Sequence, residues 1–199
     1  KKNNKVLTIK IINQTLKIVI KNINYYNVLS SLALFKVLNL EFSQILNFYK
    51  NIEPTEGRGK IHKIYRYKKK FNLIDESYNA NPLSLKNAIL NFNSIKKENF
   101  KKYLLLGDML ELGHKSVELH KGISKVINNS DIDKVFIKGI KTLNTYKNII
   151  KNKRGNILQN ESDVDFTLNN IIANNDYLMI KGSNATGLNN LSKRIIKGY

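Results

Sequence analysis

The chain has 199 residues, of which 42% are hydrophobic, and it contains no cysteine. This length suits one large domain, or one domain plus part of another, and the hydrophobic content excludes wholesale disorder. Without cysteine there is neither a disulfide framework nor a thiolate metal site. No apolar run reaches the roughly 18–20 residues that cross a bilayer, and the polar start at Lys1 does not resemble a signal peptide. We expect a cytoplasmic globular protein with no membrane span.

The formal net charge of +19 is the most unusual feature of the composition. A basic α/β module that binds nucleic acid is the alternative function that this charge suggests. Only four of the 34 basic residues are arginine, however, and 30 asparagines accompany the lysines along the whole chain. Proteins that read nucleic acids favour the planar guanidinium of arginine. We therefore interpret the charge as compositional drift and expect no nucleic-acid partner.

The first 56 residues form a short group of elements that ends where the pattern of the chain changes. Alternation and 3–4 spacing of apolar residues predict, in order, strands at 6–11 and 16–20 and helices at 28–38 and 43–49. A polar stretch with Pro54, Gly57 and Gly59 follows, and both residue types interrupt regular structure. Because these elements make only a thin core, we expect residues 1–56 to be the end of a preceding domain.

Beyond this break, strands and helices alternate through residues 57–199. The predicted strands are 61–66, 71–75, 103–106, 134–138, a short one near Ile157, and 177–180. The predicted helices are 82–95, 116–127, one from Lys141, 163–173 and 188–196. Two of the strands are apolar without alternation, as expected when helices cover both faces of a sheet. The pattern predicts an α/β, Rossmann-like layered domain with a mainly parallel sheet.

Unusual residues follow three of these strands, and ligands of such folds bind at the carboxyl ends of the strands. The segments run from Asp75 to Pro82, from Gly107 to Gly113 and from Lys181 to Gly187. The third combines a lysine, glycines and a hydroxyl before a helix, which is typical of an anion site and equally of an ordinary strand-to-helix loop. In the first, Asn81 before Pro82 is also a natural helix cap.

Metal chemistry is not indicated within this chain. Asp108 and Glu111 could be metal ligands, but ordering of their own loop explains them as well. The histidines show no zinc spacing; we expect His62 to point out from a strand and His120 to lie at the surface.

Two basic segments carry no motif of their own. Gly57-Arg58-Gly59-Lys60 lacks the upstream glycine and the final Ser/Thr of a phosphate loop. The lysine run 68–70 is expected in a hairpin turn.

Taken together, the three segments resemble motifs of the Mur ligase family. The motifs that support this resemblance are Glu76-Ser77-Tyr78-Asn79-Ala80-Asn81-Pro82, Gly107-Asp108-Met109-Leu110-Glu111-Leu112-Gly113 and Lys181-Gly182-Ser183. They occur in the family's order and spacing, and Gly57-Arg58 resembles the start of the family's C-terminal domain. The first two motifs resemble the branch that adds D-alanyl-D-alanine more than the branches that add other amino acids.

The resemblance implies an ATP-dependent amide ligase of peptidoglycan precursor synthesis. Its substrates would be UDP-N-acetylmuramoyl-tripeptide (UDP-MurNAc-tripeptide) and D-alanyl-D-alanine (D-Ala-D-Ala), joined through an acyl-phosphate in a cytoplasmic enzyme that is monomeric when complete. Residues 1–56 would be the end of the central ATP-binding domain, and residues 57–199 the C-terminal domain. ATP and Mg²⁺ would be used, with the Mg²⁺ ligands outside this chain.

The resemblance also assigns roles to individual residues. The catalytic positions would be Arg58 and Lys181. The nucleotide-binding positions would be Asn27, Arg58, Glu76 and Asn79, with Asp75 as a competitor of Glu76 for the ribose. The substrate-binding positions would be Tyr78, Asn81, Lys181, Ser183 and Asn184.

Three positions depart from the family pattern. Tyr26 stands where histidine is common, Glu56 where proline is common, and Asn184 where arginine often follows the Lys-Gly-Ser segment. The family's phosphate loop and N-terminal UDP-binding domain have no counterpart in these 199 residues. We therefore expect a fragment that is inactive alone; an inactive remnant of the ligase is a further alternative.

Overall fold

The computed structural model describes residues 5–11, 13–20 and 25–198. The chain divides into two compact units, Lys1–Thr55 and Glu56–Tyr199. Among the helices of the described residues, none is long and apolar enough to cross a membrane.

The first unit is a hairpin followed by helices. Its elements are β1 (Lys5–Ile11), β2 (Gln14–Ile20), α1 (Tyr25–Val37), α2 (Ser43–Leu46) and the 3₁₀ turn η1 (Phe48–Lys50). β1 and β2 pair antiparallel. Six side chains form the described core of this unit: Ile9, Ile18, Ile20, Val28, Leu32 and Tyr49. The prediction of one helix over 43–49 is wrong, because the helical run changes to a tighter turn at Asn47 and Tyr49 is buried in that turn.

The second unit contains a six-stranded sheet in the order β3-β4-β8-β5-β6-β7. Its strands are β3 (Lys60–Arg66), β4 (Lys69–Glu76), β5 (Lys102–Gly107), β6 (Lys134–Lys138), β7 (Arg154–Ile157) and β8 (Tyr177–Lys181). Only the edge strand β3 is antiparallel to its neighbour; the other four pairings are parallel. The predicted mainly parallel α/β fold is therefore confirmed.

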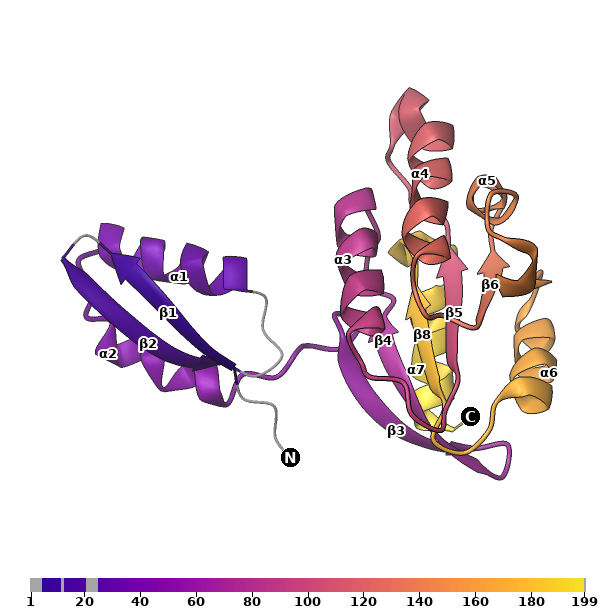
Figure 1. Cartoon of the computed structure of the whole chain (residues 1–199), viewed down its shortest axis with the longest axis horizontal. Helices are drawn as coiled ribbons and strands as arrows, with labels where there is room; N and C mark the ends of the chain where they lie inside the picture. The colour runs from indigo at the N-terminus through magenta and orange to yellow at the C-terminus, as the bar shows by residue number, and fades with distance from the viewer. Residues whose placement is uncertain (1–4, 12, 21–24, 199) are drawn as a thin grey trace. The chain divides into compact units, whose positions relative to one another are not determined.

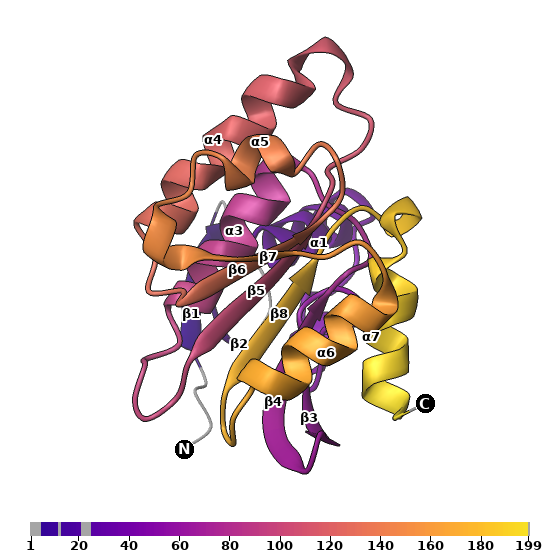
Figure 2. The ribbon, with the colours of Figure 1, turned by 90° about the vertical axis from the view of Figure 1, so that its right-hand side faces the viewer.

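Helices cover both faces of this sheet (Figures 1 and 2). They are α3 (Pro82–Asn93), α4 (Ser116–Asn128), α5 (Leu143–Tyr146), α6 (Glu161–Ile171) and α7 (Leu188–Lys197). On one face Leu104 and Leu106 pack with residues of α3 and α4. On the other, Leu105 packs with residues of α6 and α7. All six residues of β5 are buried, which explains why its sequence does not alternate.

The hairpin between β3 and β4 corrects the position of one expected turn. Tyr67 and Lys68 occupy the turn with φ values of 57° and 58°, whereas Lys69 and Lys70 already belong to β4. Two consecutive residues with positive φ are typical of the tight type I′ hairpin, whose twist matches that of the strands. The lysine run therefore lies mostly in a strand.

Candidate functional site

Three loops meet at one edge of the second unit's sheet. β4, β8 and β5 are neighbours in the sheet and run parallel, so their carboxyl ends lie at the same edge. The loop 77–81 follows β4, the loop 182–187 follows β8, and the loop 108–112 follows β5. Figure 1 shows β5 and β8 ending at this common edge. The three segments that stood out in the sequence are therefore neighbours.

Ser183 joins all three loops. Its hydroxyl Oγ accepts a hydrogen bond from the main-chain N–H of Leu110 at 2.9 Å and donates to the carbonyl of Ala80 at 3.3 Å. Its own N–H donates to the carbonyl of Asp108 at 3.0 Å. The residue is buried, so these bonds are shielded from water. Ser183 thus fixes the relative positions of the loops.

Lys181 links the loop after β4 to the end of β8. Its Nζ lies 3.3 Å from Oε2 of Glu76 and donates to the carbonyl of Asn79 at 2.9 Å. The Lys181 side chain is only 2% exposed, whereas that of Glu76 is 23% exposed. An enclosed ammonium group is expensive unless it is paired, and this carboxylate supplies the pair.

The environment of Lys181 shifts its proton affinity. Burial lowers the pKa of Lys181, the Glu76 carboxylate counteracts this by raising it, and the positive charge of Arg58 lowers it again. The net effect is a pKa below the ordinary lysine value, because desolvation disfavours the charged form. Glu76 is thus the group that favours the charged ammonium.

Asp75 faces the interior instead of a ligand. Its Oδ2 accepts from the N–H of Gly57 at 2.8 Å, and its Oδ1 accepts from the hydroxyl of Ser77 at 2.6 Å. The residue is 2% exposed. Of the two adjacent carboxylates whose roles the sequence left open, Glu76 is the one that remains accessible.

Arg58 lies in a short turn beside the end of β4. Gly57 and Gly59, on either side of it, have φ values of +75° and +95°, a region that glycine adopts without strain. The Arg58 side chain is exposed, and its guanidinium lies 4.3 Å from the centroid of the Tyr78 ring. This cation–π contact orients a positive charge next to the loop after β4.

Asp108 orders its own surroundings. Its Oδ1 accepts from the N–H and the hydroxyl of Thr142, at 2.8 Å and 2.9 Å. A Cβ on Gly139 would lie 2.3 Å from the same oxygen, so glycine permits the close approach. Among the residues that the structure describes, no group of three or more histidines and carboxylates could hold a metal ion. Of the two explanations for Asp108, loop ordering is the one that these contacts support.

Both expectations for the histidines were wrong. His120 is fully buried: its Nε2 accepts from the N–H of Met109 at 3.1 Å, and its Nδ1 lies 2.7 Å from the carbonyl of Ser116. It therefore helps to fix the loop after β5. His62 is half-buried, and burial lowers its pKa. The spacing of apolar residues on α4 places His120 on the same buried face as Ile123 and Ile127. This spacing is the sequence signal that could have predicted its burial.

Three of the predicted site residues, Asn81, Asn184 and Asn27, take no part in the contacts described above that join the three loops. Asn81 caps α3, with its side-chain oxygen accepting from the N–H of Ser84 at 2.8 Å, as the sequence also suggested. Asn184 is exposed, and its side-chain oxygen accepts from Asn189 at 3.3 Å. Asn27 belongs to the first unit and is exposed near the start of α1.

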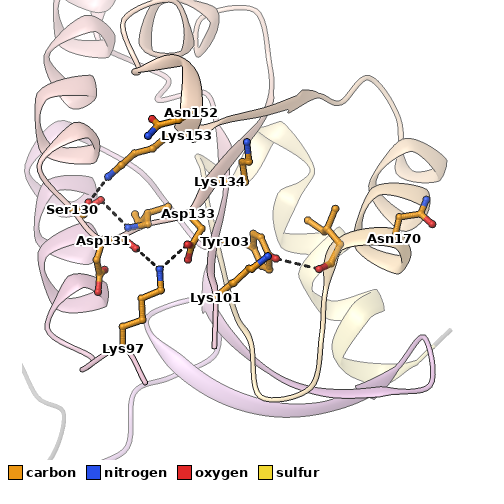
Figure 3. Close-up of a pocket in the computed structure, with 12 residues that line it drawn as sticks. Lys97, Lys101, Tyr103, Ser130, Asp131, Asp133, Lys134, Asn152, Lys153 and Asn170 are labelled. Carbon is orange, nitrogen blue, oxygen red and sulfur yellow. Dashed lines mark hydrogen bonds and ion pairs between the residues drawn. The ribbon is translucent and has the colours of Figure 1, made fainter. Parts of the chain in front are cut away.

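A hollow of about 660 Å³ lies at the amino ends of the strands, among the segments that precede β5 and β6 (Figure 3). Three of its four lysines are already engaged: Lys97 pairs with Asp133 at 2.6 Å, and Lys134 donates to the carbonyl of Arg154 at 3.4 Å. Lys153 donates to the carbonyls of Ile127 and Ser130 near the end of α4. None of the three loops contributes to its lining. The hollow is therefore a separate feature, and the candidate site remains at the carboxyl edge.

Comparison with known proteins gives consistent matches over most of the chain. The profile described as "Mur ligase, glutamate ligase domain" matches residues 61–184. A UDP-N-acetylmuramoyl-tripeptide–D-alanyl-D-alanine ligase of Buchnera aphidicola subsp. Baizongia pistaciae is 29% identical over 183 residues, covering 89% of this chain and 38% of that protein. A ligase of the same name from Rickettsia prowazekii is 26% identical over 168 residues, covering 84% of this chain and 35% of that protein.

Solved structures share the fold. The MurF ligase of Thermotoga maritima in complex with ADP gives a TM-score of 0.76 at 16% identity, covering 99% of this chain and 44% of that one. A MurF of Acinetobacter baumannii gives a TM-score of 0.75 at 16% identity, covering 98% of this chain and 42% of that one. The chain thus spans less than half the length of these relatives.

Proposed function

The chain belongs to the Mur ligase family, and from this premise we propose that it supplies the acceptor-substrate half of a ligase active site. The complete enzyme would join D-alanyl-D-alanine to UDP-N-acetylmuramoyl-tripeptide in peptidoglycan precursor synthesis, in the cytoplasm. Two relatives named UDP-N-acetylmuramoyl-tripeptide–D-alanyl-D-alanine ligase match 89% and 84% of the chain. Residues 1–56 would be the end of the ATP-binding domain, and residues 57–199 the C-terminal domain.

The reaction has two group transfers. A carboxylate oxygen of the tripeptide attacks the γ-phosphorus of ATP, forming an acyl-phosphate and releasing ADP. The amine of D-alanyl-D-alanine then attacks the acyl carbon, the carbon–oxygen bond to phosphate breaks, and the amine loses a proton as the amide forms. Mg²⁺ would neutralise charge on the phosphates. As the resemblance implies, its ligands would lie in the part of the enzyme that carries the phosphate loop.

Arg58 would contribute positive charge to phosphoryl transfer. Negative charge develops on the transferring phosphoryl oxygens, and a fixed guanidinium stabilises it. The side chain is exposed and is held against Tyr78 at 4.3 Å, so it is available to a nucleotide and has a defined direction. Glu76, with its partly exposed carboxylate, and Asn79 would contact the nucleotide beside it.

Lys181 and Ser183 would form the side of the site that receives the dipeptide. Lys181 has two acceptors within reach, Glu76 and the Asn79 carbonyl, and an ammonium group has three N–H donors. The third would donate to the carboxylate of the incoming dipeptide. Tyr78, Asn81 and Asn184 would contribute further contacts from the same edge.

The observation that carries this proposal is the junction of three loops at Ser183 and Lys181. Two of the motifs that resemble the family are joined by the Lys181–Glu76 pair, and all three by the bonds of Ser183. In an unrelated basic module, nothing would require these particular residues to meet.

The test is Arg58→Ala in the complete ligase, meaning this chain together with its phosphate-loop part. Turnover should fall about 10²-fold or more, because one positive charge leaves the transition state. The matched control is Arg154→Ala: that guanidinium binds the carbonyls of Ile149 and Lys147 at 2.8 Å and 2.9 Å, away from the three loops. Turnover of Arg58→Ala within threefold of the unaltered enzyme would refute the proposal.

A further inference from the structure

The turn that carries Arg58 is fastened to the end of β4. The N–H of Gly59 donates to the carbonyl of Asp75 at 2.7 Å, and the N–H of Tyr78 donates to the carbonyl of Gly57 at 3.0 Å. A Cβ on Gly57 would lie 2.8 Å from the Cβ of Tyr78, so the two segments are in close contact. The main chain on both sides of Arg58 therefore has little room to move.

One side chain completes this attachment. The Asp75 carboxylate accepts from the N–H of Gly57 at 2.8 Å through one oxygen, and from the hydroxyl of Ser77 at 2.6 Å through the other. The N–H of Ser77 lies 3.3 Å from this second oxygen. Asp75 and Ser77 are both almost fully buried. A carboxylate at this depth is retained only if its hydrogen bonds are satisfied, and here one of its donors is the residue next to Arg58.

We propose that Asp75 is a positioning residue of the ligase reaction: its buried carboxylate fixes the main chain of Gly57 and thereby sets the direction of Arg58. The proposal rests on the function proposed for Arg58. Asp75 touches neither the nucleotide nor the dipeptide in this account. It acts through the turn, since a displacement of about 1 Å at a catalytic group can cost roughly 10²-fold in rate.

The sheet offers a matched control for the structural cost of removing a buried carboxylate. Asp176 is also 2% exposed and also accepts from main-chain N–H groups, those of Lys101 and Ala173, both at 2.7 Å. It lies at the amino ends of β5 and β8, the opposite edge of the sheet. Asp75→Ala and Asp176→Ala should therefore lose stability by similar mechanisms, and only the first should displace Arg58.

The experiment is a double-mutant cycle in the complete ligase with Asp75→Ala and Arg58→Ala. Asp75→Ala alone should lower kcat by about 10–100-fold and leave the KM for D-alanyl-D-alanine within about threefold. In the Arg58→Ala background the same substitution should cost less than threefold, because there is no longer an arginine to position. Asp176→Ala should keep kcat within threefold.

Two results would overturn the proposal. One is a kcat for Asp75→Ala within threefold of the unaltered enzyme; the other is an equal loss in both backgrounds, which would mean that Asp75 acts independently of Arg58. If Asp75→Ala does not fold, Asp75→Val replaces it in the cycle with the same criteria. Valine fills much of the same space but offers no acceptor to the N–H of Gly57.

Amide hydrogen exchange in the 199-residue chain separates this inference from the proposed function. Loss of the carboxylate should increase exchange at the Gly57 N–H at least tenfold and leave the Ser183 N–H, bound to Asp108, unchanged. Unchanged exchange at Gly57 would contradict the inference whatever the kinetics. Normal turnover of Arg58→Ala with increased exchange at Gly57 would instead refute the function proposed for Arg58.

Discussion

The pair formed by Lys181 and Glu76 is the electrostatic centre of the candidate site. The ammonium is enclosed, with two acceptors in reach, and the carboxylate is partly open to solvent. Burial lowers the pKa of Lys181, and Glu76 only partly offsets this shift. The protein therefore tolerates the charged lysine at a cost in stability, as is common for groups that serve a site.

This cost predicts a pH dependence of folding. Between the lowered pKa of folded Lys181 and the ordinary lysine pKa, the unfolded chain binds more protons than the folded chain, so the free energy of unfolding rises with pH across that window. Urea unfolding at a series of alkaline pH values should show this rise, and Lys181→Met should reduce it. Burial also lowers the pKa of Lys153, so a smaller rise of the same sign should remain. Glu76→Gln should lower the pKa of Lys181 further and widen the window.

The control for this experiment is Lys193→Met, which removes an exposed lysine of α7. The rise should persist in that variant. A rise of equal size in Lys181→Met and in the unaltered chain would show that another group causes it.

At the scale of elements, the ends of β5 and β8 approach so closely that only glycine fits. A Cβ on Gly182 would lie 3.0 Å from the Cα of Gly107 and 2.9 Å from the Cδ1 of Leu188, the first residue of α7. A Cβ on Gly107 would meet the same Leu188 atom at 2.6 Å. Gly107 and Gly182 thus allow the ends of β5 and β8 to pack closely against the same residue, Leu188.

Gly182→Ala should accordingly destabilise the second unit by about 1–3 kcal/mol through overpacking. Gly122 is the matched control: it lies inside α4 with no atom within 4 Å of the added Cβ. Gly122→Ala should stabilise the protein by about 0.5–1 kcal/mol, since alanine favours helix. Denaturant unfolding of the two variants checks both values, and a Gly182→Ala protein as stable as the parent would contradict the packing argument.

The helices and strands could be predicted because the sequence patterns that indicate them lie within each element. Apolar periodicity placed α3 and α4, and the cap at Asn81 marked where α3 begins. Sequence also placed the three loops at one edge, since parallel strands share that edge. It could not show which side chains would turn inward. The orientation of Asp75 depends on a hydrogen bond to Gly57, and the burial of His120 depends on the loop that its ring binds, so both follow from tertiary packing.

At the scale of the whole chain, the two units differ in how well they bury their apolar residues. The second has two separate clusters, one on each face of its sheet. The first has a small core, and several large apolar side chains remain exposed: Val37 is 76% exposed and Phe48 66% exposed. A two-stranded hairpin is marginal alone, which agrees with the proposal that residues 1–56 complete a larger domain.

The central claim is that the complete enzyme containing this chain ligates D-alanyl-D-alanine. The most direct measurement is phosphate release by that enzyme with ATP and UDP-N-acetylmuramoyl-tripeptide, comparing D-alanyl-D-alanine with single amino acids as the amine. We predict amine-dependent phosphate release and an amide product with D-alanyl-D-alanine alone. Ligation of a single amino acid and none of the dipeptide would contradict the account.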